Sequence, residues 1–424
     1  MKYPKIGVYA GSGTSHSWLW FVDLFEKAGF CDLVFLDEFS VQNNDIKDLD
    51  VLVVSGGDTF AVAQSLGKAG GQHIKSFVEH GGVYIGSCAG AYLPMKSSQK
   101  PLDWFNFVDV KITNLSKLFP NAQVQTCKSC AAYGYDFVFH PVREAVSLKT
   151  TSFFDKDKSS VFTAPLYGGP GMKAHDPSWV LAVYEGFTPK TVFFTTREIA
   201  EKTLAGNGAV VRVPCKKGCF YLLGPHLEHP KFKQANQFII DAIISETDMV
   251  QDHEISKYKM PKFSTKEKLS GKEAKELLLC IKRELSNSRI VAGSLEFLPV
   301  QWLIGQKVYE PQKVRVYLEA MWKRLRFLEK NKVLILEPGL YGRITRAASQ
   351  ITLELRSIKQ QIDENRDSLK TAIIIFDLLH VLATSFFDLY FATMFNGLDK
   401  YHEHTNAHAL EGTTKYERDV RCEM

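Results

Sequence analysis

Several features that would assign this chain to a specialised class of protein are scarce. Eight cysteines in 424 residues are too few for a disulfide framework, so we interpret them as core residues, metal ligands or a nucleophile in a reducing compartment. An excess of one charge is also missing, because 52 lysines and arginines face 47 aspartates and glutamates, a net charge of +5. This balance excludes the basic footprint typical of nucleic-acid or membrane-surface binding, and we expect small-molecule chemistry.

Export and membrane signals are equally scarce. The first five residues lead directly into a strand-like segment, without the apolar region of a secretory signal, so we expect a cytoplasmic protein. One apolar stretch, Thr371 to Phe395, is long enough to cross a bilayer, but it contains Asp377, His380 and Asp388 and lacks basic flanks. We therefore interpret it as a buried helix.

Glycine is scarce in only one part of the chain. Residues 1–249 contain 22 of the 29 glycines, and residues 250–424 contain 7. Glycine marks turns, so the difference indicates a turn-rich region followed by a turn-poor one. We predict a first domain over 1–249, a polar, lysine-rich linker over 250–270, a helical domain over 271–400 and a polar tail over 401–424.

The first region alternates short β-branched runs with helix-like segments. Such repeats predict an α/β fold with a doubly wound, mostly parallel sheet. The expected strands lie at 5–9, 32–36, 51–54, 82–85, 179–184, 191–195, 209–213 and 220–223, and the expected helices at 17–28, 59–67, 72–80 and 231–247.

The second region has the pattern of amphipathic helices. Ser270 is followed three residues later by Glu273, the capping-box spacing, so we expect a helix to begin there. Apolar residues then recur every three or four positions within 274–285, 314–328 and 347–362. Their apolar faces must be buried against the first domain or against a protein partner.

The segment Gly86-Ser87-Cys88-Ala89-Gly90 has the spacing of a nucleophile elbow. It follows a predicted strand and precedes a helix-compatible segment. Glycines leave room for the sharp turn, and the start of a helix favours a thiolate. We predict that Cys88 is a catalytic nucleophile, although a buried cysteine in an ordinary strand-to-helix turn has the same local pattern.

A base and its partner follow the strand predicted at 220–223. If the backbone after Gly224 stays extended, His226 and Glu228 point the same way, because side chains alternate along a strand. Glutamate can then orient the imidazole, which completes a Cys-His-Glu triad. A lone structural histidine is the alternative for His226.

Glycine-containing strand ends predict the rest of the site. We expect the N–H groups of Ala89 and Gly57 to form an oxyanion hole. Ligands of open parallel sheets bind at the carboxyl ends of the strands. The residues expected to bind substrate there are Gly11, Gly13, Thr14, Gly56 and Asp58. Dinucleotide binding is disfavoured, because the third glycine of its fingerprint is missing after Gly13.

Two pairs of cysteines have a spacing that could suit zinc: Cys127 with Cys130, and Cys215 with Cys219. A long stretch of chain separates the pairs, and such clusters in α/β domains are often unligated. We therefore predict neither a metal site nor a cofactor.

Over residues 1–249 the chain resembles the class I glutamine amidotransferase-like superfamily, most closely the branch named after the N-terminal domain of fungal biotin-protein ligase. The resemblance rests on the motifs described above and on Tyr167-Gly168-Gly169-Pro170-Gly171. It implies a flavodoxin-like fold, the Cys88, His226 and Glu228 triad, and a place for Gly169 near the pocket. The usual His-Pro-Glu is His226-Leu227-Glu228 here, without the rigid proline.

These observations favour a cysteine-dependent amidohydrolase or amidotransferase-like enzyme that acts on a small amide through an acyl-enzyme. Biotin ligation is not expected, because the chain has no Gly-Arg-Gly-Arg type segment and residues 271–400 do not resemble a ligase domain. Two alternatives stay open. One is a non-catalytic regulatory or assembly protein that binds a small ligand and uses its helical domain to engage a partner; the other is a peptidase of the same superfamily.

Overall fold

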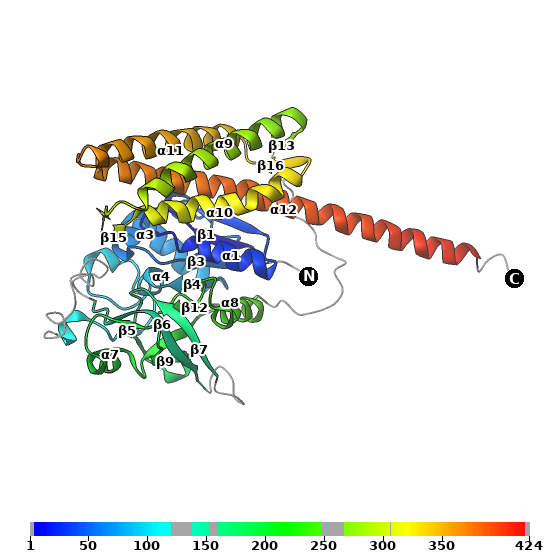
Figure 1. Cartoon of the computed structure of the whole chain (residues 1–424). Helices are drawn as coiled ribbons and strands as arrows, with labels where there is room; N and C mark the ends of the chain where they lie inside the picture. Colours follow the sequence, from blue (N-terminus) through cyan, green and yellow to red (C-terminus); the bar gives the residue numbers. More distant parts are fainter. Residues whose placement is uncertain (1–3, 120–137, 152–159, 248–266, 306, 420–424) are drawn as a thin grey trace.

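The computed structural model describes residues 4–119, 138–151, 160–247, 267–305 and 307–419 (Figure 1). Side chains are described up to residue 396. A twelve-stranded sheet occupies the N-terminal part, with the order β10-β6-β9-β11-β12-β4-β3-β1-β2 along its main path. Its parallel half contains β2 (Leu33–Leu36), β1 (Ile6–Tyr9), β3 (Val51–Val54), β4 (Val83–Ser87) and β12 (Gly218–Leu223).

The other strands pair antiparallel, so the sheet is mixed rather than mostly parallel. They are β11 (Gly208–Cys215), β9 (Val180–Phe187), β6 (Val142–Thr150) and β10 (Val192–Phe193) on the main path, with β7 (Val161–Leu166), β8 (Met172–Ala174) and β5 (Val110–Ile112) beside it. The predicted α/β sheet followed by helices is thus confirmed, while the parallel arrangement holds for one half only.

Helices cover both faces of the parallel half because its strands alternate between two apolar cores. Val51 and Val53 face one core, and Leu52 and Val54 face the other. The first core is shared with α1 (Trp18–Ala28) and α8 (Lys233–Glu246), the second with α2 (Glu38–Gln42) and α3 (Thr59–Glu79). The two helices predicted at 59–67 and 72–80 form the single α3, interrupted by non-helical backbone at Gly67.

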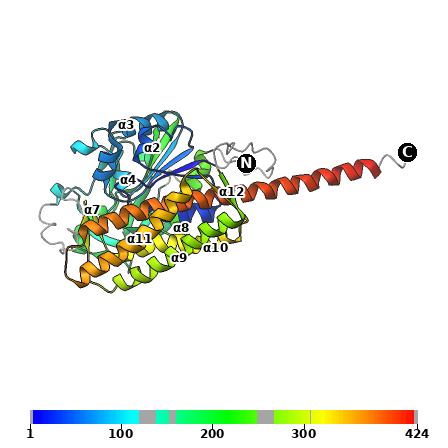
Figure 2. The same ribbon diagram turned by 90° about the horizontal axis from the view of Figure 1, so that it is seen from above.

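The second region contains four long helices that lie side by side on one side of the sheet (Figure 2). They are α9 (Gly271–Leu295), α10 (Pro311–Lys330), α11 (Leu340–Asp363) and α12 (Leu369–Asp419). Two small antiparallel pairs accompany them: β13 (Glu267–Ser270) with β16 (Val333–Leu336), and β14 (Trp302–Ile304) with β15 (Lys307–Tyr309).

The structure differs from the sequence prediction for this region in one cap, one strand and the end of one helix. A helix begins after Ser270 as expected, but the Ser270 side chain makes no capping hydrogen bond. Residues 267–270 form a strand instead of linker, and 248–266 lie outside the described residues. The backbone of α12 continues as a helix to Asp419, through most of the segment expected to be a polar tail.

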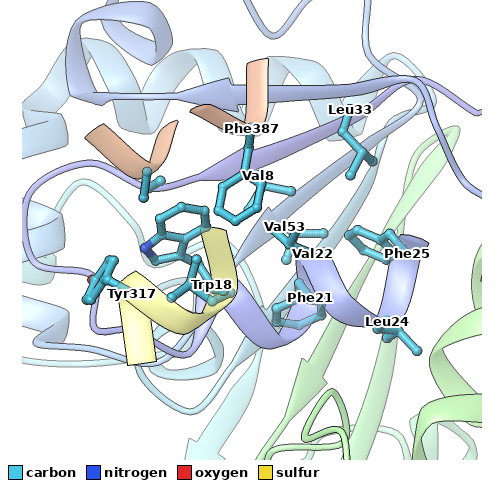
Figure 3. Packing of buried hydrophobic residues seen from close by; sticks show 14 of the residues in the cluster. Val8, Trp18, Phe21, Val22, Leu24, Phe25, Leu33, Val53, Tyr317 and Phe387 are labelled. Atoms are coloured by element: carbon cyan, nitrogen blue, oxygen red, sulfur yellow. The ribbon is translucent and has the colours of Figure 1, made fainter. Parts of the chain in front are cut away.

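The helices pack on the face of the sheet that α1 covers, through aromatic side chains (Figure 3). The Trp18 ring lies 6.2 Å from the Tyr317 ring of α10 and 5.8 Å from the Phe387 ring of α12. Below them, Arg324 of α10 is 2% exposed and donates to Asp23 and Glu26 of α1 at 2.8 and 2.5 Å. One continuous apolar core therefore joins the two regions.

The apolar stretch of α12 lies in this interface. Residues 369–396 are long and apolar enough to cross a membrane, and 56% of their most apolar window is buried inside the protein. Phe386 and Phe387 are fully buried. His380 is hydrogen-bonded through Nδ1 to the Ala10 carbonyl oxygen at 3.1 Å and through Nε2 to the Tyr317 hydroxyl at 2.7 Å. The polar residues noted in the stretch therefore include a histidine hydrogen-bonded across the interface.

Candidate active site

Cys88 lies at the turn between β4 and the short helix α4 (Ala89–Tyr92). Its φ of 51° is in the left-handed region that side chains rarely adopt. The flanking glycines are required by close backbone contacts: a Cβ on Gly90 would lie 2.0 Å from the Val54 carbonyl oxygen, and one on Gly86 2.2 Å from the Gly90 oxygen. The spacing in the sequence thus corresponds to the geometry of a nucleophile elbow.

Strand pairing brings the triad residues together. Leu223, the last residue of β12, pairs in register with Ser87, and its carbonyl accepts from the Cys88 N–H at 2.9 Å. The chain after Gly224 is not extended, as the sequence argument assumed, but turns, with the Leu227 N–H donating to the Pro225 carbonyl. The expected contact forms nevertheless, since His226 Nδ1 lies 2.6 Å from Glu228 Oε1.

Glu228 is fully buried and held on both oxygens. Ser87 Oγ lies 3.0 Å from each of them, in addition to the contact with His226. The carboxylate therefore fixes the imidazole so that Nε2 is the nitrogen left to face Cys88. Ser87 was not predicted, although its place next to Cys88 and opposite Leu223 could have indicated it.

The electrostatics favour a thiolate–imidazolium pair. Burial would lower the pKa of His226, but the Glu228 carboxylate and the hydrogen bond with Cys88 raise it to about 9. Burial would raise the pKa of the Cys88 thiol, yet the hydrogen bond and charge of His226, and then the charge of Lys307, bring it below its ordinary value. A cysteine with these neighbours has the character of a nucleophile.

Cys88 and His226 face a cavity of about 300 Å³ between the two regions of the chain. Its volume is at the low end of the range of small-molecule sites. The sheet region contributes Ser15, His16, Ser17, Trp20, Gly56, Gly57, Cys88, Arg143, Glu144, Tyr167 and His226, and the helical region contributes Lys307, Val308, Tyr309, Gln312, Lys313 and Val316.

One of the two predicted oxyanion donors lines this cavity, and the other directly follows Cys88 in the chain. Gly57 lines it, and Ala89 is the first residue of α4, so its N–H has no acceptor within the helix. Gly56 also lines it, and a Cβ there would come within 2.6 Å of His226 Cε1. Backbone without side chains is therefore required beside the imidazole.

Four of the other predicted substrate residues lie elsewhere. Gly11, Gly13, Thr14 and Asp58 line a neighbouring cavity of about 550 Å³ that α12 borders. The Asp58 carboxylate also caps α3, accepting from the Phe60 and Ala61 N–H groups.

Gly169 is not among the residues that line either of these two cavities. A Cβ at this position would lie 1.7 Å from the Gly224 carbonyl oxygen, so glycine allows two backbone segments to approach each other. The close contact between these two backbone segments explains why position 169 is a glycine.

The aromatic and cationic lining was missed by the sequence reasoning. The Trp20 ring meets the His226 ring edge-on at 5.3 Å, and the Tyr167 ring lies 5.6 Å from it. Trp20 had the pattern of a core residue on an amphipathic helix. Lys307 and Lys313 carry no local signal at all, because they reach the site only through the packing of the helical region.

Metal ligands are not grouped at the site. Among the residues that the structure describes, no three His, Cys, Asp or Glu side chains could hold a metal ion together. Cys127 and Cys130 lie outside those residues. Cys215 and Cys219 lie at the end of the β11–β12 hairpin, and burial raises the pKa of Cys219 to about 12.

The family comparison agrees with the motifs. The family model described as biotin-protein ligase, N terminal, matches residues 34–276. Among solved structures, a ThuA-like protein from Bacteroides uniformis matches with 14% identity and a TM-score of 0.34, over 59% of this chain and 95% of that one. A β-galactosidase from Bacillus circulans matches with 11% identity and a TM-score of 0.33, over 58% of this chain.

The chain spans 31% of the length of that β-galactosidase. No curated protein matches it. The family match covers more than half of the chain and includes Cys88, His226 and Glu228. The protein therefore belongs to the biotin-protein ligase N-terminal family, within the class I glutamine amidotransferase-like superfamily.

Proposed function

We propose that this protein cleaves a small amide through a covalent acyl-enzyme on Cys88. The observation that carries the proposal is the buried Cys88–His226–Glu228 arrangement, in which the pKa of the thiol is lowered and the pKa of the imidazole is raised to about 9. Opposite charges on nucleophile and base are typical of cysteine enzymes that cleave acyl bonds. The small cavity suits a small-molecule amide better than a polypeptide.

The residues act in two half-reactions. The Cys88 thiolate attacks the amide carbonyl carbon, and the Ala89 and Gly57 N–H groups stabilise the oxyanion. His226 Nε2 then protonates the leaving nitrogen, the carbon–nitrogen bond breaks, and a thioester and a free amine or ammonia result. Water attacks the thioester, His226 accepts its proton, and the carboxylic acid leaves as the Cys88 thiolate and the His226 imidazolium are restored. Delivery of the amine to an acceptor, instead of its release, would make the protein an amidotransferase.

Ligation of biotin is not part of this proposal. The family takes its name from biotin-protein ligase, but the match ends at residue 276. The remaining chain is a group of helices without the Gly-Arg-Gly-Arg type segment.

The test is intact-mass analysis after incubation with a set of small amides and a diazo-ketone analogue of glutamine. We expect one adduct, located on Cys88 by peptide mapping, and loss of both adduct and amide turnover in Cys88→Ala. Turnover should fall by at least ~10³-fold when the nucleophile is removed. Cys280→Ala is the matched control, because Cys280 is another free thiol that does not line the cavity.

The opposite result identifies the second candidate function. If the wild-type protein turns over none of the amides and Cys88→Ala keeps the affinity for a ligand of this cavity, the site binds without catalysis. The helical wall over Cys88 is the observation that favours this alternative, since regulatory proteins also enclose small ligands between two regions.

A further inference from the structure

The cavity at Cys88 has an uneven distribution of charge. Its helical wall carries Lys307 on β15 and Lys313 in the first turn of α10, while its sheet wall carries Arg143 and Glu144 as neighbours on β6. Three cationic side chains thus face one carboxylate. The triad contributes a thiolate, an imidazolium and the Glu228 carboxylate, one net negative charge, so the cavity still carries an excess of positive charge.

Three of these four groups already have partners. The Arg143 guanidinium lies 5.0 Å from the centre of the Tyr167 ring, and the Tyr167 hydroxyl donates to Glu144 at 3.1 Å. Lys313 Nζ donates to the Val308 carbonyl and lies 4.9 Å from the Tyr309 ring. Burial, followed by the charge of Lys307, lowers the pKa of Lys313 to about 8.

Lys307 is different. Its side chain is half-buried, and within the described part of the chain no carboxylate lies at ion-pair distance from its ammonium group. Its charge acts on the cavity, since it lowers the pKa of Cys88 and of His16. An ammonium group that faces the cavity without an ion-pair partner is available to bind an anionic group of a ligand.

The position of Lys307 is set by the β14–β15 hairpin. The preceding Gly305 has a φ of +59°, and a Cβ there would lie 3.2 Å from the Asp58 carboxylate oxygen. The hairpin therefore packs on the loop after β3 that also carries Gly56 and Gly57. Lys307 lines both the Cys88 cavity and the neighbouring one, so it lies where they meet.

We propose that the substrate of this site carries an anionic group, a carboxylate or a phosphate, which Lys307 binds while the amide carbonyl lies at Cys88. This inference rests on the proposed amide cleavage and adds the substrate class. Lys307 lies outside residues 34–276, the segment that matches the family. The helical region, and not the family segment, thus contributes the residue that selects the substrate.

The test compares two alkylating reagents at one thiol, iodoacetate and iodoacetamide, which differ in charge but react by the same displacement of iodide. Both rates depend on the fraction of Cys88 that is thiolate, so their ratio does not. We expect the iodoacetate-to-iodoacetamide ratio at Cys88 to exceed that of N-acetylcysteine. In Lys307→Met it should fall about three- to tenfold.

Two variants control the measurement. Lys307→Arg keeps the charge and should keep the ratio near the wild-type value. Lys330→Met removes an exposed lysine at the end of α10, outside the residues that line the cavity, and should leave the ratio unchanged. Higher ionic strength should lower the ratio in the wild type and have less effect in Lys307→Met, because salt screens the ammonium group.

Each outcome separates the two proposals. Rapid alkylation of Cys88 with the same ratio in wild type and Lys307→Met overturns the anion site and leaves the nucleophile intact. If Cys88 reacts with neither reagent while Cys280 does, the proposed function fails, and this inference with it. If the ratio falls in Lys307→Met as expected, a competition experiment identifies the anion: glutarate should protect Cys88 from iodoacetamide if the site binds a carboxylate, and inorganic phosphate should do so if it binds a phosphate. If neither anion protects Cys88, the anion site is contradicted.

Discussion

The two walls of the Cys88 cavity are built in different ways. On the sheet wall, Cys88, His226 and Glu228 come from two paired strand ends and are 4% exposed or less. His226 is hydrogen-bonded to Glu228, and the charge of His226 lowers the pKa of Cys88. On the helical wall, Lys307 and Lys313 come from a hairpin and a helix start far along the chain. The charged groups of the sheet wall contact one another, whereas Lys307 of the helical wall has no ion-pair partner among the described residues. In our two proposals, reaction chemistry and ligand choice therefore belong to separate parts of the fold.

The largest effect should follow from breaking the ionic contact that holds the helical wall on the sheet region. Arg324→Met leaves Asp23 and Glu26 without their buried partner, and we expect the free energy of unfolding to fall by about 3 kcal/mol. Urea denaturation followed by tryptophan fluorescence measures it. Lys323→Met, the neighbour that is half-exposed and contacts the same Asp23, should cost less than about 1 kcal/mol. Equal losses of unfolding free energy in Arg324→Met and Lys323→Met would mean that burial of the ion pair does not determine its contribution to stability.

The next effect concerns the sheet wall alone. His226→Ala should slow the alkylation of Cys88 by iodoacetamide at pH 7 about tenfold or more, because a thiol with the ordinary pKa of about 8.5 is only ~3% ionised at that pH. Peptide mapping after short exposures gives the rate at this residue. His229→Ala is the control: burial lowers the pKa of His229 to about 4, so its ring is uncharged at pH 7. Unchanged reactivity in His226→Ala would show that the imidazole does not stabilise the thiolate.

The smallest effect is a shift in the pH at which half of the Cys88 thiol reacts as thiolate. Glu228→Gln removes two opposing influences on Cys88: the carboxylate raises the pKa of the thiol directly, and it also maintains the positive charge of His226, which lowers it. The influence of His226 on the thiol is the larger one, so the alkylation midpoint should move to higher pH, by roughly one unit. Glu144→Gln, which removes a carboxylate bound to Tyr167, should leave the midpoint in place. A shift of the midpoint to lower pH would show that the direct effect of the Glu228 carboxylate on the pKa of the thiol is larger than its effect through His226.

The sequence could identify the sheet wall because its information is local. Gly86 to Gly90 encode the elbow within five residues, and His226 and Glu228 are two residues apart. Their contact was predicted on the condition of an extended backbone, which the structure does not have. The contact forms nevertheless, because a tight turn can also bring together two side chains separated by one residue. The strands β6 and β7 were missed, since Arg143, Glu144 and Pro165 interrupt their β-branched patterns.

The helical wall could not be predicted in the same way. Lys307 follows no motif, and it reaches Cys88 only because the β14–β15 hairpin rests on the loop after β3. Amphipathic spacing predicted the helices around it, since that spacing depends on burial of one face. It could not predict which surface each face contacts, because many apolar surfaces satisfy the same pattern.

The shared core beneath Trp18 means that the two regions gain or lose their structure together. Removal of the helices would expose the Trp18 ring and the Phe35 side chain of β2, which now pack on Phe387. The helical wall of the Cys88 cavity, with Lys307 and Lys313, would be lost at the same time. Calorimetry should accordingly record one endotherm for the chain. A substitution on α12 that unfolds the helices, far from any reacting atom, should abolish the reactivity of Cys88 as completely as a substitution at the elbow.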